Sequence, residues 1–216
     1  FSFLGKTNEI TIAVENKPWE PYYTGKGRFD SKKPGVWVEL LKRVEKNLKS
    51  ESLKIKYKRL PWKRCLTSLK SNYVDAVLGA SFKKSRMEVG EYPMNSGKPD
   101  NTMGVTNSTY SFYKLKSGKV EWDGKKFLNL AGSRKIGVTA GYSIGDDLKK
   151  MNIRIHSGTH SKNVLDMVLK RRLSGFAGFT DSTDSIIGKD KAKYSSVIKS
   201  KAPIKEKTYY LILSKK

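Results

Sequence analysis

Residues 74–93, VDAVLGASFKKSRMEVGEYP, place a short apolar run, small residues and an arginine close together. The run Val74–Leu78 predicts a buried strand that stops at Gly79-Ala80-Ser81, before a polar turn and a helical segment that carries Arg86. Hydroxyls, backbone N–H groups and a guanidinium then gather at a strand's carboxyl end, where open α/β sheets bind ligands. Helix starts favour anions, and a guanidinium grips a carboxylate through two parallel hydrogen bonds. The stretch therefore favours a site for a small carboxylate, although it is equally compatible with a surface arginine that follows an ordinary buried strand.

The segments before this stretch follow a β-α-β-α-β order. Strands are predicted at Ile10–Val14 and Leu53–Leu60, and a helix is predicted to start at Pro61. Between the two strands, five aliphatic residues lie on one helical face and predict its buried side: Val36, Leu40, Leu41, Val44 and Leu48. This order implies a parallel sheet with right-handed crossovers.

After a connector at Pro93–Thr109, rich in Pro, Gly, Asn, Ser and Thr, the same rhythm begins again. Strands are predicted at residues 110–115, 135–139, 152–156 and 175–179, with helical segments between the later ones. We therefore expect an α/β fold with two lobes, each a mainly parallel sheet flanked by helices. Lobe one is expected to comprise residues 1–108 plus 201–216 and lobe two residues 109–200, with a ligand cleft between them.

Composition narrows the class of protein. The 216 residues suffice to bury a core, and 37% hydrophobic residues argue against intrinsic disorder. The net charge of +24 raises nucleic acid or an anionic membrane as partners. However, the basic residues come as scattered pairs such as Lys83-Lys84 and Lys149-Lys150, and aromatic residues do not alternate with them as base stacking requires. We read the charge as solvated faces and expect no nucleic-acid partner.

Residues for chemistry are sparse. Cys65 is the only cysteine, and with Trp62, Leu66 and Leu69 it lies on one predicted helix face, so we expect an inert core residue. His156 and His160 are separated by Ser-Gly-Thr, which breaks the helix that a metal pair at this spacing requires. We find no nucleophile motif and no pair of carboxylates for acid–base work. The chain is predicted to hold a ligand rather than transform it, without a metal or cofactor.

Three further places are candidates for ligand contact. The proline-punctuated loop after the first strand holds Trp19, Tyr22 and Tyr23 as either an apolar wall or a cap on the core. Gly141-Tyr142-Ser143 provides a second helix start with a hydroxyl, a weak anion cradle. Asp181 ends a strand, where it either accepts hydrogen bonds from an ammonium group or caps the following helix, the commoner role.

The order of these elements resembles the bacterial periplasmic solute-binding proteins of family 3, the polar amino-acid uptake type with a two-lobed "Venus flytrap" fold. Four segments, which together span nearly the whole chain, carry the resemblance: IAVENKPWEPYY followed by GVWVELLKRV, VDAVLGASFKKSR, KIGVTAGYSIGDDL and SGFAGFTDS. Each is loose alone, but their order and spacing are moderately specific as a set.

The resemblance implies a role for each position. Arg86 would clamp the α-carboxylate of an amino acid, helped by Ser81 and by Ser143 with its helix start. Asp181 would take the α-ammonium, and Trp19 with Tyr22 would form the aromatic wall. The sequence departs from the family pattern at other positions that would line the pocket. Gly79 stands where many amino-acid binders have a hydroxyl, Lys83 replaces their usual threonine and Tyr142 is bulkier than the common threonine, so the ligand need not be a standard amino acid.

The resemblance also implies an extracytoplasmic, periplasmic monomer that captures an amino acid or related carboxylate by cleft closure and delivers it to an ABC-type membrane permease. No apolar run approaches the roughly 18 residues of a membrane span, and the first residues, Phe1–Leu4, lack a leader pattern, so a signal peptide would already have been removed. Three alternatives stay open. One is the ligand-sensing domain of a receptor, and another is a dehydratase-like enzyme with Asp181 or Glu15 as its proton-transferring group. The last is a basic nucleic-acid binder, which steeply salt-dependent binding to DNA would support.

Overall fold

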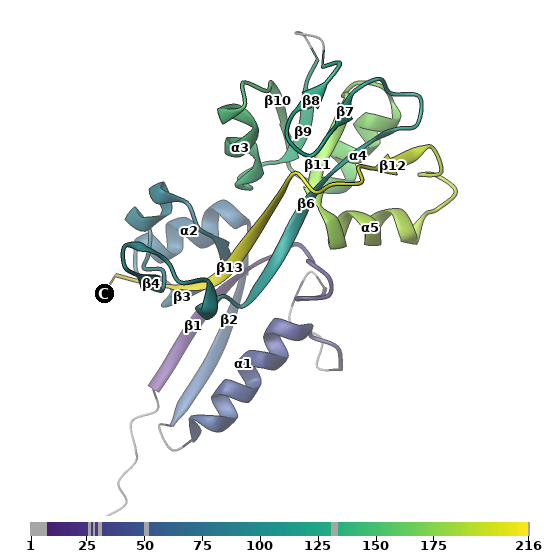
Figure 1. Ribbon diagram of the computed structural model, residues 1–216. Coiled ribbons are helices and arrows are strands. Elements are labelled where there is room, and N and C mark those ends of the chain that lie inside the picture. Colours follow the sequence, from purple (N-terminus) through teal and green to yellow (C-terminus); the bar gives the residue numbers. More distant parts are fainter. Residues whose placement is uncertain are drawn as a thin grey trace, which may run out of the picture. The chain divides into compact units, whose positions relative to one another are not determined.

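The computed structural model describes residues 8–25, 27, 29, 32–49, 52–130 and 134–215. The chain divides into two compact units. Unit 1 comprises Phe1–Thr106 and Thr208–Lys216, and unit 2 comprises Asn107–Lys207. The chain therefore passes from one unit to the other twice, and each unit is described by itself below (Figure 1).

The sheet of unit 1 has the order β2-β1-β3-β13. Its strands are β1 (Asn8–Glu15), β2 (Leu53–Leu60), β3 (Ala76–Ser81) and β13 (Lys205–Leu213). β1 pairs in parallel with both β2 and β3, as the β-α-β-α-β order predicts, whereas β13 adds an antiparallel strand next to β3. The strands predicted at Ile10–Val14 and Leu53–Leu60 are confirmed as β1 and β2.

The helices of unit 1 are α1 (Val36–Asn47), which packs against β2, and α2 (Trp62–Lys70), which packs against β1 and β3 (Figure 1). The predicted buried face of α1 is wrong except at Leu41. Four of its five residues are exposed, from 36% of the side chain at Val44 to 54% at Val36, and Trp37 and Val38 are buried in their place. Half of the twelve residues of this helix are apolar, so spacing alone cannot select the face, and the large Trp37 ring takes the buried position.

The strand predicted at Val74–Leu78 both starts and ends later than expected, because β3 begins at Ala76. β3 does not stop at Gly79 but continues to Ser81, and every one of its residues is buried. The pairing register with β13 shifts at Gly79, because Tyr210 pairs with Ala80 and Leu211 with Leu78. Gly79 takes a φ of +85°, which lets the strand bulge and continue rather than end. Short elements follow, ending at the crossing to unit 2: η2 (Lys84–Glu88), β4 (Met94–Asn95), β5 (Lys98–Pro99) and η3 (Asn101–Met103).

The sheet of unit 2 has the order β10-β9-β11-β6, with β12 paired to β6. Its strands are β6 (Thr106–Leu115), β9 (Ile136–Thr139), β10 (Ile155–Gly158), β11 (Gly175–Phe179) and β12 (Val197–Lys199). β9 is parallel to β10 and β11, whereas β6 runs antiparallel to β11 and β12. The α/β class is confirmed, with parallel strands at the centre of each unit and antiparallel strands beside them. The sequence analysis did not predict β12 or the hairpin of β7 (Glu121–Trp122) and β8 (Phe127–Leu128).

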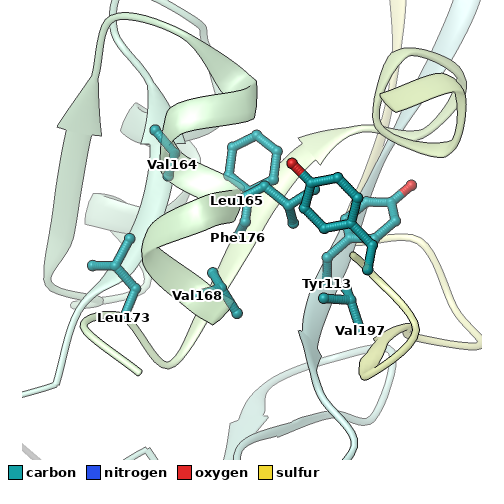
Figure 2. Close-up of a cluster of buried hydrophobic side chains, with 8 residues drawn as sticks. Tyr113, Val164, Leu165, Val168, Leu173, Phe176 and Val197 are labelled. Atoms are coloured by element: carbon teal, nitrogen blue, oxygen red, sulfur yellow. The ribbon is translucent and has the colours of Figure 1, made fainter. Parts of the chain in front are cut away.

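Three helices flank this sheet: α3 (Ile144–Lys150), α4 (Ser161–Leu169) and α5 (Thr180–Lys189). The spacing of Val164, Leu165, Val168 and Leu169 predicts an apolar stripe on α4. The first three are fully buried and Leu169 is half-buried, which confirms the stripe. Figure 2 shows Leu165 beside Phe176 of β11 and Tyr113 of β6, whereas Val164 packs against Gly137 of β9 and Gly158 of β10. Burying three aliphatic side chains of this size removes about 1.5–3 kcal/mol of unfavourable hydration each, which holds α4 on the sheet.

Cys65 is fully buried in α2, as expected of a core residue. Burial, together with the nearby Glu15 carboxylate, raises the pKa of its thiol to about 12. The thiol is therefore protonated at neutral pH and is not a nucleophile.

Candidate functional site

Arg86 is fastened to the end of β3 in unit 1. Its side chain is only 5% exposed, and Nη1 donates to the Ser81 carbonyl oxygen at 2.7 Å and to Ser81 Oγ at 3.1 Å. The guanidinium also lies over the Trp62 ring, 5.2 Å from the ring centroid, which allows a cation–π contact. The predicted pair of Arg86 and Ser81 is thus brought together, but as a buried cluster rather than as an exposed arginine on a turn.

Tyr92 completes this cluster, although the sequence analysis gave it no role. Its hydroxyl donates to the same Ser81 carbonyl oxygen at 2.9 Å. Burial raises the pKa of Tyr92 to about 12, although the Arg86 guanidinium opposes this shift. The phenol therefore stays protonated and donating at neutral pH, so two donors converge on one carbonyl. No sequence signal marks Tyr92, because the contact depends on where the chain returns after η2.

Gly79 lies beneath the aromatic rings of unit 1. A Cβ atom on Gly79 would come within 2.6 Å of Trp37 Cζ3 and 3.6 Å of Trp19 Cζ3. Glycine is therefore required at position 79 for two reasons: the positive φ and the close approach of the indole rings. The packing of Trp37 therefore explains why position 79 has glycine and not the hydroxyl residue of many amino-acid binders.

The aromatic loop forms a cluster around Trp19. The Trp19 ring contacts Tyr22 and Trp37 edge-on, with centroids 5.0 and 4.9 Å away, and also meets Tyr23 and Tyr209. Trp19 and Tyr23 are buried, whereas Tyr22 is half-buried. The cap reading therefore describes Trp19 and Tyr23, and Tyr22 is the most exposed of the three.

Arg59 of β2 anchors the same loop from beneath. Its guanidinium donates to the carbonyl oxygens of Glu15, Thr24 and Gly25 at 3.0, 2.9 and 2.7 Å. Burial lowers the pKa of Arg59, and the nearby Tyr23 and Glu15 oppose this shift. This role could not be predicted from the sequence, because Arg59 is one of 44 basic residues.

Glu15, the proton-transfer candidate of the enzyme alternative, ends β1. It is 4% exposed, and its carboxylate Oε1 lies 3.7 Å from Lys17 Nζ. At 3.7 Å this is a long ion pair, and Glu15 is buried beside the loop that Arg59 anchors.

Ser143 of unit 2 is buried at the start of α3, and its hydroxyl makes no capping hydrogen bond. Lys207 Nζ instead donates to Ser143 Oγ at 2.8 Å and forms an ion pair with Asp147 of the same helix. Lys207 was missed because it is one of several lysines near the start of β13. Lys207 is distinguished only by the fold, which places the last residue of unit 2 beside α3. The predicted anion cradle is thus a lysine–serine–aspartate group, and α3 itself has only seven residues.

Tyr142 lies beside further aromatic rings of unit 2. Its centroid is 5.2 Å from that of Phe179, which stacks on Tyr110 at 4.3 Å. Lys207 Nζ lies 5.9 Å from the Tyr110 centroid, so the same lysine links the aromatic rings to Ser143. The bulk of Tyr142 is therefore used in packing along the carboxyl ends of β9 and β11.

Asp181 lies in the first turn of α5 and is exposed. The cap reading is wrong, because the helix begins at Thr180 and Phe179 holds the N-cap position. A carboxylate in the first helical turn is stabilised by the backbone dipole, so an ionised Asp181 is favourable there. The position leaves it accessible to an ammonium group.

Within residues 8–25, 27, 29, 32–49, 52–130 and 134–215, no three His, Cys, Asp or Glu side chains gather as ligands for a metal ion. None of the helices in this described part has the length and apolar character needed to cross a membrane.

No protein-family model and no curated protein sequence matches the chain. Solved structures do match its fold. The AvGluR1 ligand-binding domain in complex with glutamate has a TM-score of 0.74 at 13% identity over 98% of this chain and 84% of that one. A histidine kinase sensor domain with similarity to periplasmic binding proteins gives 0.73 at 13% identity, over 97% and 84%. The holo form of ArgBP from T. maritima gives 0.70 at 13% identity, over 96% and 83%. The chain has the periplasmic-binding-protein fold, as the sequence resemblance implied.

Proposed function

We propose that the chain binds a small amino-acid-like ligand, an amino acid or a related carboxylate. The observation that carries this proposal is the Arg86 cluster at the carboxyl end of β3, on a fold shared with structures that hold glutamate. A buried guanidinium fixed by Ser81 is oriented before the ligand arrives, so little entropy is lost when it grips a carboxylate.

The second part of the proposal is a counter-charge from unit 2. Asp181 is exposed in a helical first turn and accepts the α-ammonium of the ligand. Burying the two charges of an amino acid is tolerable only when each meets an opposite charge and oriented donors. A ligand held by groups from both units then favours a closed arrangement by its greater affinity for that state.

The remaining candidates shape the pocket in this proposal. Tyr22 presents its half-buried ring to the ligand, with Trp19 behind it and Gly79 beneath. On unit 2, Ser143 acts together with Lys207, and Tyr142 narrows the space. The glycine and the larger tyrosine support a pocket reshaped relative to that of common amino-acid binders.

The biological role we propose is capture by an extracytoplasmic, monomeric binding protein that serves an ABC-type permease. The alternative is a ligand-sensing domain of a larger receptor, favoured by the likeness to a histidine kinase sensor domain and to the AvGluR1 ligand-binding domain. We propose binding without turnover; a dehydratase-like reaction through Asp181 or Glu15 is the alternative that product analysis would detect.

The experiment is a thermal-shift screen of the purified protein against amino acids, the matching amines that lack the carboxylate, and organic acids. A ligand at a hundredfold excess over its Kd stabilises the folded state by about 2.7 kcal/mol, which raises the melting temperature measurably. We expect stabilisation by one group of α-amino acids and none by their amines. Stabilisation by the amines alone, or by no carboxylate, would contradict the proposal.

A further inference from the structure

Unit 2 contains a cavity at the amino ends of β9 and β11. It has a volume of about 320 Å³, and the residues that matter for its chemistry are Lys119, Arg134, Arg171 and Ser174. Arg134 precedes β9 and Ser174 precedes β11, and the first residues of these parallel strands pair with each other. The cavity therefore lies at the amino ends of the strands, whereas Asp181 follows the carboxyl end of β11. Five residues of strand separate the two ends by roughly 17 Å.

The charge in this cavity is unbalanced. Lys119, Arg134 and Arg171 line it, and the lining residues include no Asp or Glu. In the part of the chain that the structure describes, none of these three cations forms an ion pair.

A cavity of about 370 Å³ elsewhere in unit 2 provides an internal comparison. It too is lined by lysines, but Glu121 pairs with Lys114 and Asp184 pairs with Lys199, and the lining includes Glu121 and Asp123. A net charge of +24 therefore does not by itself explain the unbalanced positive charge at the 320 Å³ cavity, because lysines at the 370 Å³ cavity are paired with acidic residues.

Ser174 adds a buried polar atom to the cationic cavity. Its Oγ is buried and has no hydrogen-bond partner among the described residues, although Ser174 N donates to the Lys135 carbonyl oxygen. A buried hydroxyl without a partner is unfavourable, and an anionic oxygen in the cavity would accept its hydrogen bond.

Arg171 occupies an unusual backbone position. It follows α4 with a φ of +55°, its N–H donates to the Val168 carbonyl oxygen, and the next N–H donates to that of Met167. This left-handed turn after a helix normally uses Gly or Asn. The corresponding turns after α2 and α3 use Asn72 and Asn152. Only the turn at the cavity accepts the steric strain of a long side chain, and that side chain carries a guanidinium.

We propose that this cavity binds an oxyanion of the phosphate class, either as free phosphate or as the phosphate group of a larger molecule. Arg134 and Arg171 grip the anion, because the planar guanidinium matches the oxygens of phosphate through paired hydrogen bonds. Lys119 adds a third positive charge, and the Ser174 hydroxyl donates to the anion. The cavity is larger than phosphate itself, which leaves room for the remainder of a phosphorylated small molecule. The inference does not depend on the proposed amino-acid site.

The test is calorimetric titration of the whole chain with inorganic phosphate, with glycerol 3-phosphate and with phosphatidylglycerol vesicles. Arg171→Gly removes the guanidinium while supplying the residue that the turn prefers, so the variant should fold at least as well as the parent. We expect it to weaken phosphate binding about tenfold or more, since a charge-assisted bidentate contact is lost. Arg172→Gln is the matched control, because Arg172 is exposed, adjacent and absent from the cavity lining, and we expect less than a twofold effect.

The three arms distinguish the source of the phosphate group. Tighter binding of glycerol 3-phosphate than of phosphate indicates a soluble phosphorylated ligand, and Arg171-dependent vesicle binding indicates a lipid headgroup. Ser174→Ala should weaken binding without changing net charge. The proposal is overturned if no arm saturates with a Kd below about 10 mM, or if Arg172→Gln loses as much affinity as Arg171→Gly, because general charge attraction would then explain the binding.

Discussion

The carboxyl end of β3 in unit 1 and the carboxyl end of β11 in unit 2 carry the two charged groups proposed for the ligand, and they are built in opposite ways. At the end of β3, Arg86 is buried and bonded to Ser81, with Tyr92 donating to the same carbonyl oxygen. At the end of β11, Asp181 stands exposed in the first turn of α5. One strand end therefore has its cation built into the fold, and the other presents its anion to solvent.

Because of this difference, substitutions at Arg86 mainly test the stability of the fold, whereas substitutions at Asp181 mainly test ligand binding. Removing Arg86 takes a donor from a buried carbonyl, so the fold and the proposed carboxylate clamp are lost together. Asp181 is exposed, so we expect removal of its charge to lower stability less than removal of the buried Arg86, and to act on a ligand mainly through binding. The two positions thus answer different questions, and the clearer test of function is at Asp181.

The largest expected effect is that of Arg86→Met. The substitution keeps much of the apolar stem but leaves Ser81 without its charged donor, and we expect the free energy of unfolding to fall by about 2–3 kcal/mol. Urea denaturation followed by tryptophan fluorescence measures it. Lys84→Met is the matched control, because Lys84 lies in the same short helix, η2, and is exposed. A loss below about 0.5 kcal/mol for Arg86→Met would mean that the cluster does not hold the strand end.

The next effect concerns the strand rather than the charge. Gly79→Ala forces a Cβ onto a residue with φ of +85° and to within 2.6 Å of the Trp37 ring, so we expect a loss on the order of 2 kcal/mol in the same assay. Gly188→Ala in α5 is the contrast, because a Cβ there meets nothing within 4 Å. We expect it to raise stability by up to about 0.5 kcal/mol. Equal effects at the two glycines would contradict the strained bulge in β3.

Much of the fold follows from local pattern. The central strands and the α4 stripe were predictable, because β-branched runs and 3.6-residue spacing reflect burial directly. The face of α1 was not, because apolar residues cover too much of that helix and the size of Trp37 decides. The end of β3 was also misread, because a glycine that usually stops a strand here forms a bulge opposite a strand more than 120 residues later in the chain.

The candidate site was predictable only in its residue types. The strand-turn-arginine and strand-aspartate patterns placed Arg86 after β3 and Asp181 after β11, and their roles toward a ligand stay predictions. The partners that define their surroundings come from distant segments, as Lys207 does for Ser143 and Tyr92 for Ser81. Such contacts leave no periodic signal, and in a chain with 44 basic residues no single lysine can be singled out by charge.

The smallest expected change in stability belongs to Asp181→Asn, and the same variant gives the most direct test of the proposed function. Loss of a first-turn carboxylate should lower the free energy of unfolding by about 0.5 kcal/mol at most. Glu206→Gln, an exposed acid of the same unit, serves as the control for net charge.

The measurement is calorimetric titration of wild type, Asp181→Asn and Glu206→Gln with the amino acid that gives the largest thermal shift. The account predicts a Kd at least about tenfold higher for Asp181→Asn, because a buried ammonium loses its counter-charge, and an unchanged Kd for Glu206→Gln. An unchanged Kd for Asp181→Asn would contradict the account, since the ligand would then be held without the anion that the proposed two-unit site requires.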